Sequence, residues 1–138
     1  MPRPPQPVGH FDTSNNENWI ATESGNATIT PTLILKWSPG SDSDGASIPK
    51  LLQGPFSPRF ESATFAQAFV HDMLYAARLV PRKLADYIFF RQLLAGGVHI
   101  FKARIYYAAV YTCGWYVWNR HTPGSVMAMR SVVTVERI

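Results

Sequence analysis

The sequence predicts an α+β domain in which a small antiparallel sheet packs with three helices. Short β-prone segments occupy residues 19–37, and three longer segments with helical spacing follow between residues 63 and 119. The chain then closes with "SVVTVERI", whose β-branched residues alternate as in a strand. The 138 residues, 46% of them hydrophobic, have the size and composition of one compact domain. We therefore expect N-terminal strands, a loop, three helices and a final strand that returns to the N-terminal sheet.

Residues 1–17 are expected to form an extended arm ahead of a single domain over residues 18–138. The first nine residues contain four prolines and one glycine, a composition that excludes a helix and buries little by itself. They also lack the apolar core of a signal peptide. We expect the arm to lie against its own domain or a neighbouring chain. Its predicted partner-binding residues are Pro2, Pro4, Pro5 and Pro7.

The N-terminal strands are predicted from the β-prone pieces "NWIATES", "NATITP" and "TLILKWS", which Gly25-Asn26 and Pro31 separate. The next segment, "SPGSDSDG", is so rich in turn formers that it predicts a loop. Further prolines extend this irregular path to about Arg59.

Three helices are predicted over residues 63–79, residues 81–95 and a third stretch from residue 98 or 100 to residue 119. The serine before the first helix is a suitable N-cap, and a proline suits the first turn of the second. A glycine pair ends the second helix, and "HTPG" breaks the third.

The first helix has an apolar side, which we expect to face the core, and a polar line that we expect to face away from it. The polar line consists of Gln67, His71, Tyr75 and Arg78. His71 and Asp72 lie about 100° apart on the wheel, so a site would need a third residue, which Asp44 of the "DGASIP" loop could supply. Alternatively, His71 hydrogen-bonds a loop carbonyl and Asp72 caps a helix or pairs with an arginine. The structural alternative is favoured because a single His-Asp pair arises easily by chance.

Asp86 of the second helix shares a face with aromatic residues, and Arg82 precedes it by one turn. Apolar surroundings would raise the pKa of this carboxyl and suit it to proton transfer, whereas an i,i+4 ion pair would keep it charged and structural. The spacing favours the ion pair. The candidate catalytic residues are Asp44, His71, Asp72 and Asp86. The candidate metal ligands are Asp44, His71 and Asp72, an oxygen-rich set that suits Mg, Mn or Fe.

Aromatic residues of the third helix fall on one stripe, which we interpret as part of the core. The stripe consists of Tyr107, Tyr111, Trp115 and Trp118, with Gly114 in the same sector. The alternative is an aromatic contact surface for a protein partner or a sugar. The lone cysteine, Cys113, is predicted to be a small buried hydrophobe.

Charge and hydropathy exclude several classes of function. The formal net charge is +4, but no run of basic residues and no nucleic-acid signature motif is present, so no specific nucleic acid is expected as a partner. The longest apolar run, residues 105–118, is shorter than the ~20 residues that span a bilayer. The HExxH, paired CxxC and GxSxG motifs are absent, and no organic cofactor is implied.

The ordered motifs "DGASIPKLL", "AFVHDMLY" and "RKLADYIFFRQLL" resemble the DUF1353 family of small phage and prophage proteins without an assigned function. The resemblance covers roughly residues 30–118, and Ser43 replaces the threonine usual before the first motif. It implies a phage origin and suggests that the polar positions of the motifs belong together. These positions are Asp44, Gly45, Ala46, Ser47, Pro49, His71, Asp72, Tyr75 and Asp86.

Two functions are compatible with these observations. In the first, the protein is a virion structural or assembly component of a phage tail, neck or baseplate. It would be made in the bacterial cytoplasm and would bind other virion proteins or its own copies. The alternative is a small hydrolase of the bacterial cell wall, with a divalent metal as its only implied cofactor. The low charge and the proline-rich arm favour the first.

Overall fold

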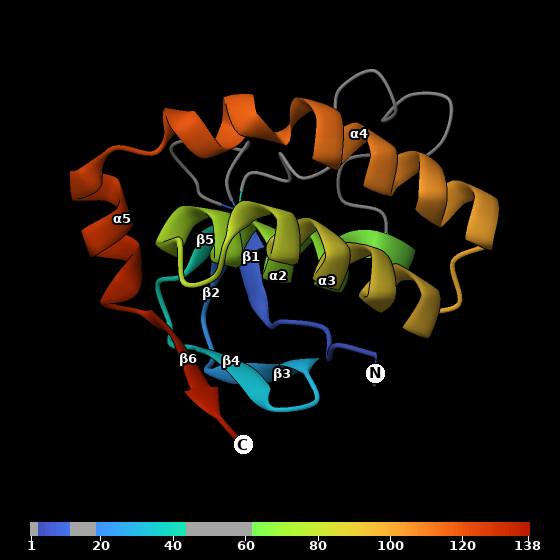
Figure 1. Ribbon diagram of the computed structural model, residues 1–138. Coiled ribbons are helices and arrows are strands. Elements are labelled where there is room, and N and C mark those ends of the chain that lie inside the picture. Colours follow the sequence, from blue (N-terminus) through green and yellow to red (C-terminus); the bar gives the residue numbers. More distant parts are fainter. Residues whose placement is uncertain (1–2, 12–18, 44–61) are drawn as a thin grey trace.

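The computed structural model describes residues 3–11, 19–43 and 62–138 and has the predicted α+β architecture (Figure 1). Its strands form two small antiparallel sheets rather than the single sheet expected, because β2 pairs with β5 and not with the strand that follows it in the chain. One sheet has the order β1-β2-β5, with strands Gly9–Phe11, Trp19–Ala21 and Asp42–Ser43. The other has the order β3-β4-β6, with strands Gly25–Thr30, Leu33–Trp37 and Val133–Arg137.

The final strand returns to the N-terminal strands, as predicted, by pairing with β4. Val133 lies opposite Trp37 in this antiparallel register. Gly25, expected to separate two strands, instead begins β3 opposite Trp37. A side chain at this position would collide with the indole ring of Trp37, so the glycine lets the ring cover the strand.

Four helices lie in the described part of the chain: α2 Ser62–Ala77, α3 Arg82–Ala95, α4 Ile100–Arg120 and α5 Pro123–Arg130. The first three match the predicted helices, whereas α5 was not expected. Its N-terminus is a capping box, in which Thr122 Oγ1 accepts from the Ser125 amide at 3.1 Å and Ser125 Oγ accepts from the Thr122 amide at 2.9 Å. The segment that ends α4 therefore also starts a helix, because proline is well suited to a first helical turn.

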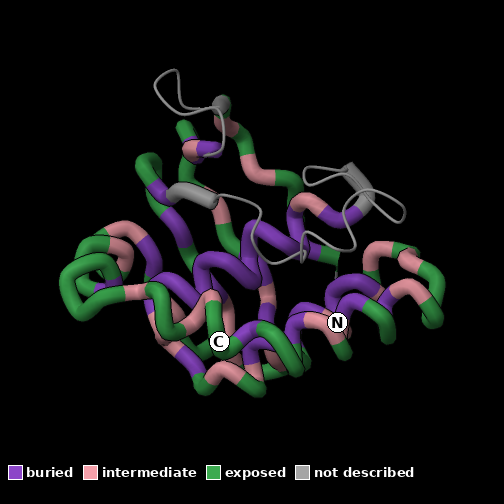
Figure 2. Tube along the Cα trace, turned by 90° about the horizontal axis from the view of Figure 1, so that it is seen from above, coloured by how far each residue is buried: buried purple, intermediate pink, exposed green. Residues whose placement is uncertain are grey.

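The central element is α2, which has strands on one side and α3 and α4 on the other (Figure 1). Every residue from position 66 to position 77 is buried. On the strand side, Phe69 packs edge-on against Trp19 and Trp37, with ring centroids 5.5 and 5.2 Å apart. Figure 2 shows buried segments running through the middle of the molecule. This central position leaves residues 66–77 of α2 without a solvent-facing side.

The described part of the predicted arm packs against its own domain. β1 pairs with β2, and the Thr22 amide donates to the Val8 carbonyl at 2.9 Å. Pro4 is buried, Pro5 is exposed and Pro7 is half-buried, whereas Pro2 lies outside the described residues. The segment Gly9–Phe11, assigned to the arm from the sequence, is thus a strand of the sheet. None of the helices described is both long and apolar enough to cross a membrane.

Candidate functional site

A buried polar cluster joins α2 to α3 beneath α4. Asp86 of α3 is completely buried. Its Oδ1 atom accepts hydrogen bonds from His71 Nε2 at 2.8 Å and from the Tyr75 hydroxyl at 2.5 Å. Its Oδ2 atom accepts from Arg82 Nη1 at 3.2 Å. We refer to these four residues, His71, Tyr75, Arg82 and Asp86, as the Asp86 cluster.

Helical spacing explains why these residues meet. His71 and Tyr75 lie one turn apart on α2, and Arg82 and Asp86 lie one turn apart on α3, so each pair presents its side chains on one face of its helix. The Arg82–Asp86 ion pair predicted from the spacing is confirmed. The contact between His71 and Asp86 was not predicted, because it depends on how the two helices pack.

The polar line of α2 does not face away from the core as expected. Gln67, His71 and Tyr75 are 0%, 1% and 2% exposed, because α3 and α4 cover the side of α2 that the strands leave open. The buried Gln67 amide donates to the Gln92 carbonyl of α3 at 3.4 Å. The line is therefore the polar part of an interface between helices.

The third helix of this interface is α4. Arg82 Nη1 also donates to the Tyr111 carbonyl at 3.2 Å, which ties α3 to α4. Gly114 of α4 lies directly against the Tyr75 hydroxyl, and a methyl group at this position would overlap it. The group that approaches Gly114 most closely is thus the Tyr75 side chain of α2.

The electrostatics of the cluster follow from its burial. Burial lowers the pKa of His71, and the neighbouring Asp86 carboxylate only partly opposes this effect. Burial raises the pKa of Tyr75 above its ordinary value, and the hydrogen bond to Asp86 raises it further. Near neutral pH His71 is therefore neutral and donates its Nε2–H to Asp86, as the Tyr75 hydroxyl also does. Arg82 supplies the positive charge that compensates the carboxylate.

The chemistry open to the Asp86 cluster is limited by access. It contains groups that could transfer protons, but His71 and Asp86 are 1% and 0% exposed and their side chains bond to each other. Only the side chain of Arg82 is substantially exposed, at 20%. The arrangement thus fastens α2, α3 and α4 together in the manner of a satisfied buried polar network.

The remaining candidate catalytic and metal-binding residues are Asp72 and Asp44. Asp72 lies on α2 and is 9% exposed. Asp44 falls outside the described residues, so the predicted approach of Asp44 to His71 or Asp72 stays a prediction. Among residues 3–11, 19–43 and 62–138, no three His, Cys, Asp or Glu side chains are grouped so that they could hold a metal ion.

A second candidate site is the outer side of α4. The aromatic stripe assigned to the core lies largely outside it: Tyr111 is 40% and Trp115 56% exposed, while Trp118 is half-buried against Tyr75. The core side of α4 is instead formed by Ala103, Tyr106, Val110 and Gly114. The stripe does not face the core, because the side of α4 that packs on the Asp86 cluster is the one that carries Gly114 and Val110. Cys113, predicted to be buried, is also exposed.

Further apolar residues extend this exposed surface along the helix. Phe101, Ile105 and Tyr116 are 67%, 40% and 61% exposed. At 100° per residue they fall on the same half of α4 as Trp115. We refer to Phe101, Ile105, Tyr111, Trp115 and Tyr116 as the α4 outer surface. The sequence allowed two interpretations of the aromatic stripe, a part of the core or a contact surface. The exposure of these side chains fits a contact surface better than a part of the core.

Fold and site together define a small α+β domain whose central helix is held to its neighbours by a buried His-Asp-Tyr-Arg cluster. The family model described as "Protein of unknown function (DUF1353)" matches residues 27–110, and the chain belongs to this family. The matched region contains the whole Asp86 cluster but ends before Trp115. A search of the curated proteins and a search of the solved structures found no significant match.

Proposed function

We propose that the protein is a virion structural or assembly component of a phage tail, neck or baseplate, acting through protein–protein contacts. The α4 outer surface carries the proposal. A helix that is apolar on its outer side as well as on its core side is normally covered on both. Exposed Trp and Tyr in one patch are typical of the central part of a protein interface.

The Asp86 cluster supports the same proposal. Its carboxylate has three internal donors and its two uncharged members are shielded from solvent. Such a cluster serves to fix the helices, and a rigid helix layer is what an interaction surface requires. The exposed Pro5 beside the buried Pro4 leaves part of the N-terminal segment accessible to a neighbour.

The phage part of the proposal rests on the phage origin that the family resemblance implies. We infer that the protein is made in the bacterial cytoplasm and is incorporated into the particle. Its partners would be other virion proteins or further copies of itself.

The test is incorporation into particles. The Trp115→Ala, Tyr116→Ala double variant should be folded by circular dichroism but lower in purified particles, by immunoblot, by about tenfold or more, because interface aromatics dominate binding energy. Met127→Ala removes an equally exposed apolar side chain from α5 and should be incorporated normally. Absence of the unaltered protein from purified particles would overturn the proposal.

A hydrolase of the bacterial cell wall remains the second candidate, favoured by one observation. A carboxylate that bonds a histidine ring, as Asp86 does His71 at 2.8 Å, is the arrangement that orients histidine for acid–base catalysis. This candidate requires a movement that opens the cluster, and a metal under this candidate would need Asp44. Release of soluble fragments from purified peptidoglycan, abolished in folded His71→Gln, would favour it over the virion role.

A further inference from the structure

The charge of the protein is divided unevenly between its helical part and the rest. Residues 62–130 contain eight Lys and Arg but only two carboxylates, a formal charge of +6, so the remainder of the chain carries −2 of the total +4. The two carboxylates are Asp72 and Asp86, and both are buried. Within residues 62–130, the exposed charged side chains are therefore all cationic.

Several of these cations border the α4 outer surface. The Lys83 ammonium lies 5.8 Å from the centre of the Tyr111 ring, and the Arg120 guanidinium lies 6.0 Å from the centre of the Tyr116 ring. Arg104 is exposed on the same half of α4 as Phe101 and Trp115. The surface thus has an apolar, aromatic centre and a rim of positive charge.

We infer that the α4 outer surface binds a partner protein whose own contact surface is apolar with an acidic rim. This inference rests on the proposed function and specifies its partner. Electrostatic complementarity across an interface guides association and excludes partners of like charge. A second copy that docked through the same surface would bring Arg104 and Arg120 against cations, so self-association through α4 is disfavoured.

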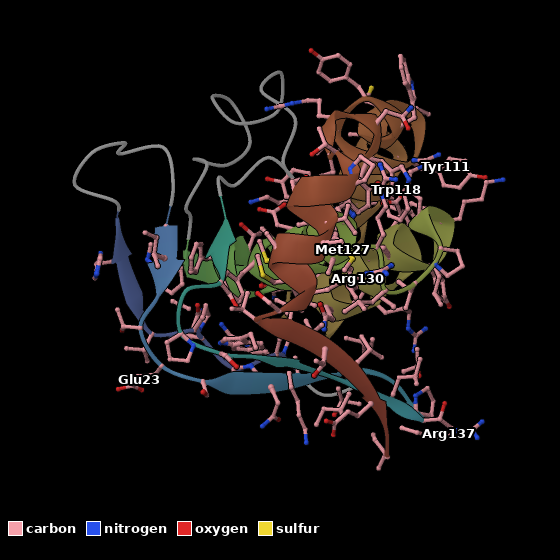
Figure 3. The ribbon with its side chains drawn as sticks, turned by 90° about the vertical axis from the view of Figure 1, so that its left-hand side faces the viewer. Glu23, Tyr111, Trp118, Met127, Arg130 and Arg137 are labelled. Carbon is pink, nitrogen blue, oxygen red and sulfur yellow. The ribbon has the colours of Figure 1, made fainter. Side chains whose placement is uncertain are left out.

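A photo-crosslinker placed in the surface identifies what covers it. We would place p-benzoylphenylalanine at Tyr116 and, as a control, at Glu23, and express each protein in the bacterium that carries the gene. Glu23 lies at the strand end of the molecule, far from Tyr111 of α4 (Figure 3). Cross-linked peptides would be sequenced by mass spectrometry.

The expected result is a cross-link from position 116, but not from position 23, to a different polypeptide in a segment with net negative charge. Combining Arg104→Glu with Arg120→Glu should reduce this cross-link by about tenfold or more, because like charges would then face each other. Arg137→Glu, a charge reversal on the strand side, should leave it unchanged. High salt should weaken the cross-link in the unaltered protein.

Four results would overturn the inference: a cross-link to a second copy of the chain, to lipid, to nucleic acid, or to a protein segment without acidic residues. Failure of any cross-link to form at position 116 would overturn it as well. If the captured protein is acidic but is not a component of the particle, the partner chemistry stands and the proposed virion function fails. The two proposals therefore fail separately.

Discussion

At the residue scale, Asp86 is the buried charge on which the polar contacts between α2 and α3 converge. A completely buried carboxylate is tolerated when donors surround it, and here three donors from two helices reach its two oxygens. The arginine compensates the charge, while the neutral histidine and tyrosine add directional bonds. Removing the charge of Asp86 should therefore first of all reduce the stability of the protein.

Asp86→Asn is expected to destabilise the protein by about 2–4 kcal/mol, because the amide keeps the shape but leaves Arg82 uncompensated and cannot accept at both positions. Chemical denaturation would measure the loss. Asp72→Asn, measured in parallel, should likewise reduce stability before it affects any activity. Bound metal measured in the same samples distinguishes the roles: stoichiometric metal that is lost in stable variants would identify these carboxylates as ligands.

Gly114 provides a test of how tightly the cluster is packed. Alanine favours a helix interior over glycine by about 1 kcal/mol, yet its methyl group would overlap the Tyr75 hydroxyl. We expect Gly114→Ala to destabilise the protein by about 1–3 kcal/mol. In a Tyr75→Phe background, where the hydroxyl is absent, the same substitution should cost less. Equal costs in both backgrounds, measured by denaturation in a double-mutant cycle, would show that the hydroxyl is not the obstacle.

His71 should make stability depend on pH. Its pKa is lowered in the folded protein by burial, whereas the unfolded chain binds a proton near the ordinary value of 6.5. The unfolded state then holds more protons below that value, so the free energy of unfolding should fall as the pH drops from about 7 to about 5. His71→Gln retains an N–H donor toward Asp86 but cannot titrate. Urea denaturation across this range should show a shallower fall in the variant; identical slopes would contradict the assignment.

At the element scale, two arginines satisfy the C-terminal carbonyls of two helices. Arg78, just beyond α2, donates to the Trp118 carbonyl of α4 at 2.8 Å and the His121 carbonyl at 3.1 Å. Arg130 of α5 donates to the Ala77 carbonyl of α2 at 2.7 Å. These bonds complement the negative ends of α4 and α2 and hold α5 in place.

Arg78 also has a left-handed backbone, with φ +48°. Both Arg78→Ala and Arg78→Gly would lose the guanidinium bonds, at a cost of about 1.5–3 kcal/mol. Only glycine removes the backbone strain, so Arg78→Gly should be the more stable of the two by about 1 kcal/mol. At the exposed helix-interior residue Arg91 the order should reverse, with glycine the less stable. Thermal denaturation of the four variants would test both orders.

Some elements of this fold could be predicted from the sequence and others could not. The first three helices were predictable because breakers bound each of them, and the Arg82–Asp86 pair was predictable because its spacing is local. The burial of His71 and the division of the strands into two sheets depend on which elements cover which, and spacing within one element does not carry that information. One signal for the Asp86 cluster was available: two polar i,i+4 pairs flank the short 78–81 connection, so an antiparallel arrangement of the helices brings them together.

α5 and the position of the α4 stripe were missed for a related reason. "HTPG" was interpreted only as a helix break, although Thr122 and Ser125 have the spacing of a capping box. On α4, aromatic size was taken to indicate burial. Small Ala103 and Gly114 instead lie on the packed side. At Gly114 the Tyr75 hydroxyl leaves no room even for a methyl group.

At the scale of the whole molecule, the residues that stabilise the fold are distinct from the exposed apolar residues of the α4 outer surface. The strands and α2 form one core, and α3 and α4 enclose a second small cluster around Phe89, Leu93 and Tyr106. The outer side of α4 contributes to neither cluster. Substitutions on the α4 outer surface should therefore change binding while leaving the fold intact, which is what makes the incorporation experiment interpretable.

The N-terminal segment offers the last test, because it combines an internal contact with an accessible part. Deleting residues 1–7 removes buried Pro4 but leaves the pairing of β1 with β2, so the melting temperature should fall by only about 5 °C. Deleting residues 1–11 also removes β1 and uncovers Trp19, which is 8% exposed, and should cost considerably more. If the arm contributes to assembly, the shorter deletion should reduce incorporation into particles by more than its effect on stability explains. Differential scanning fluorimetry would measure the melting temperature, and immunoblotting of purified particles would measure incorporation. Normal incorporation of this variant would show that the segment serves its own domain alone.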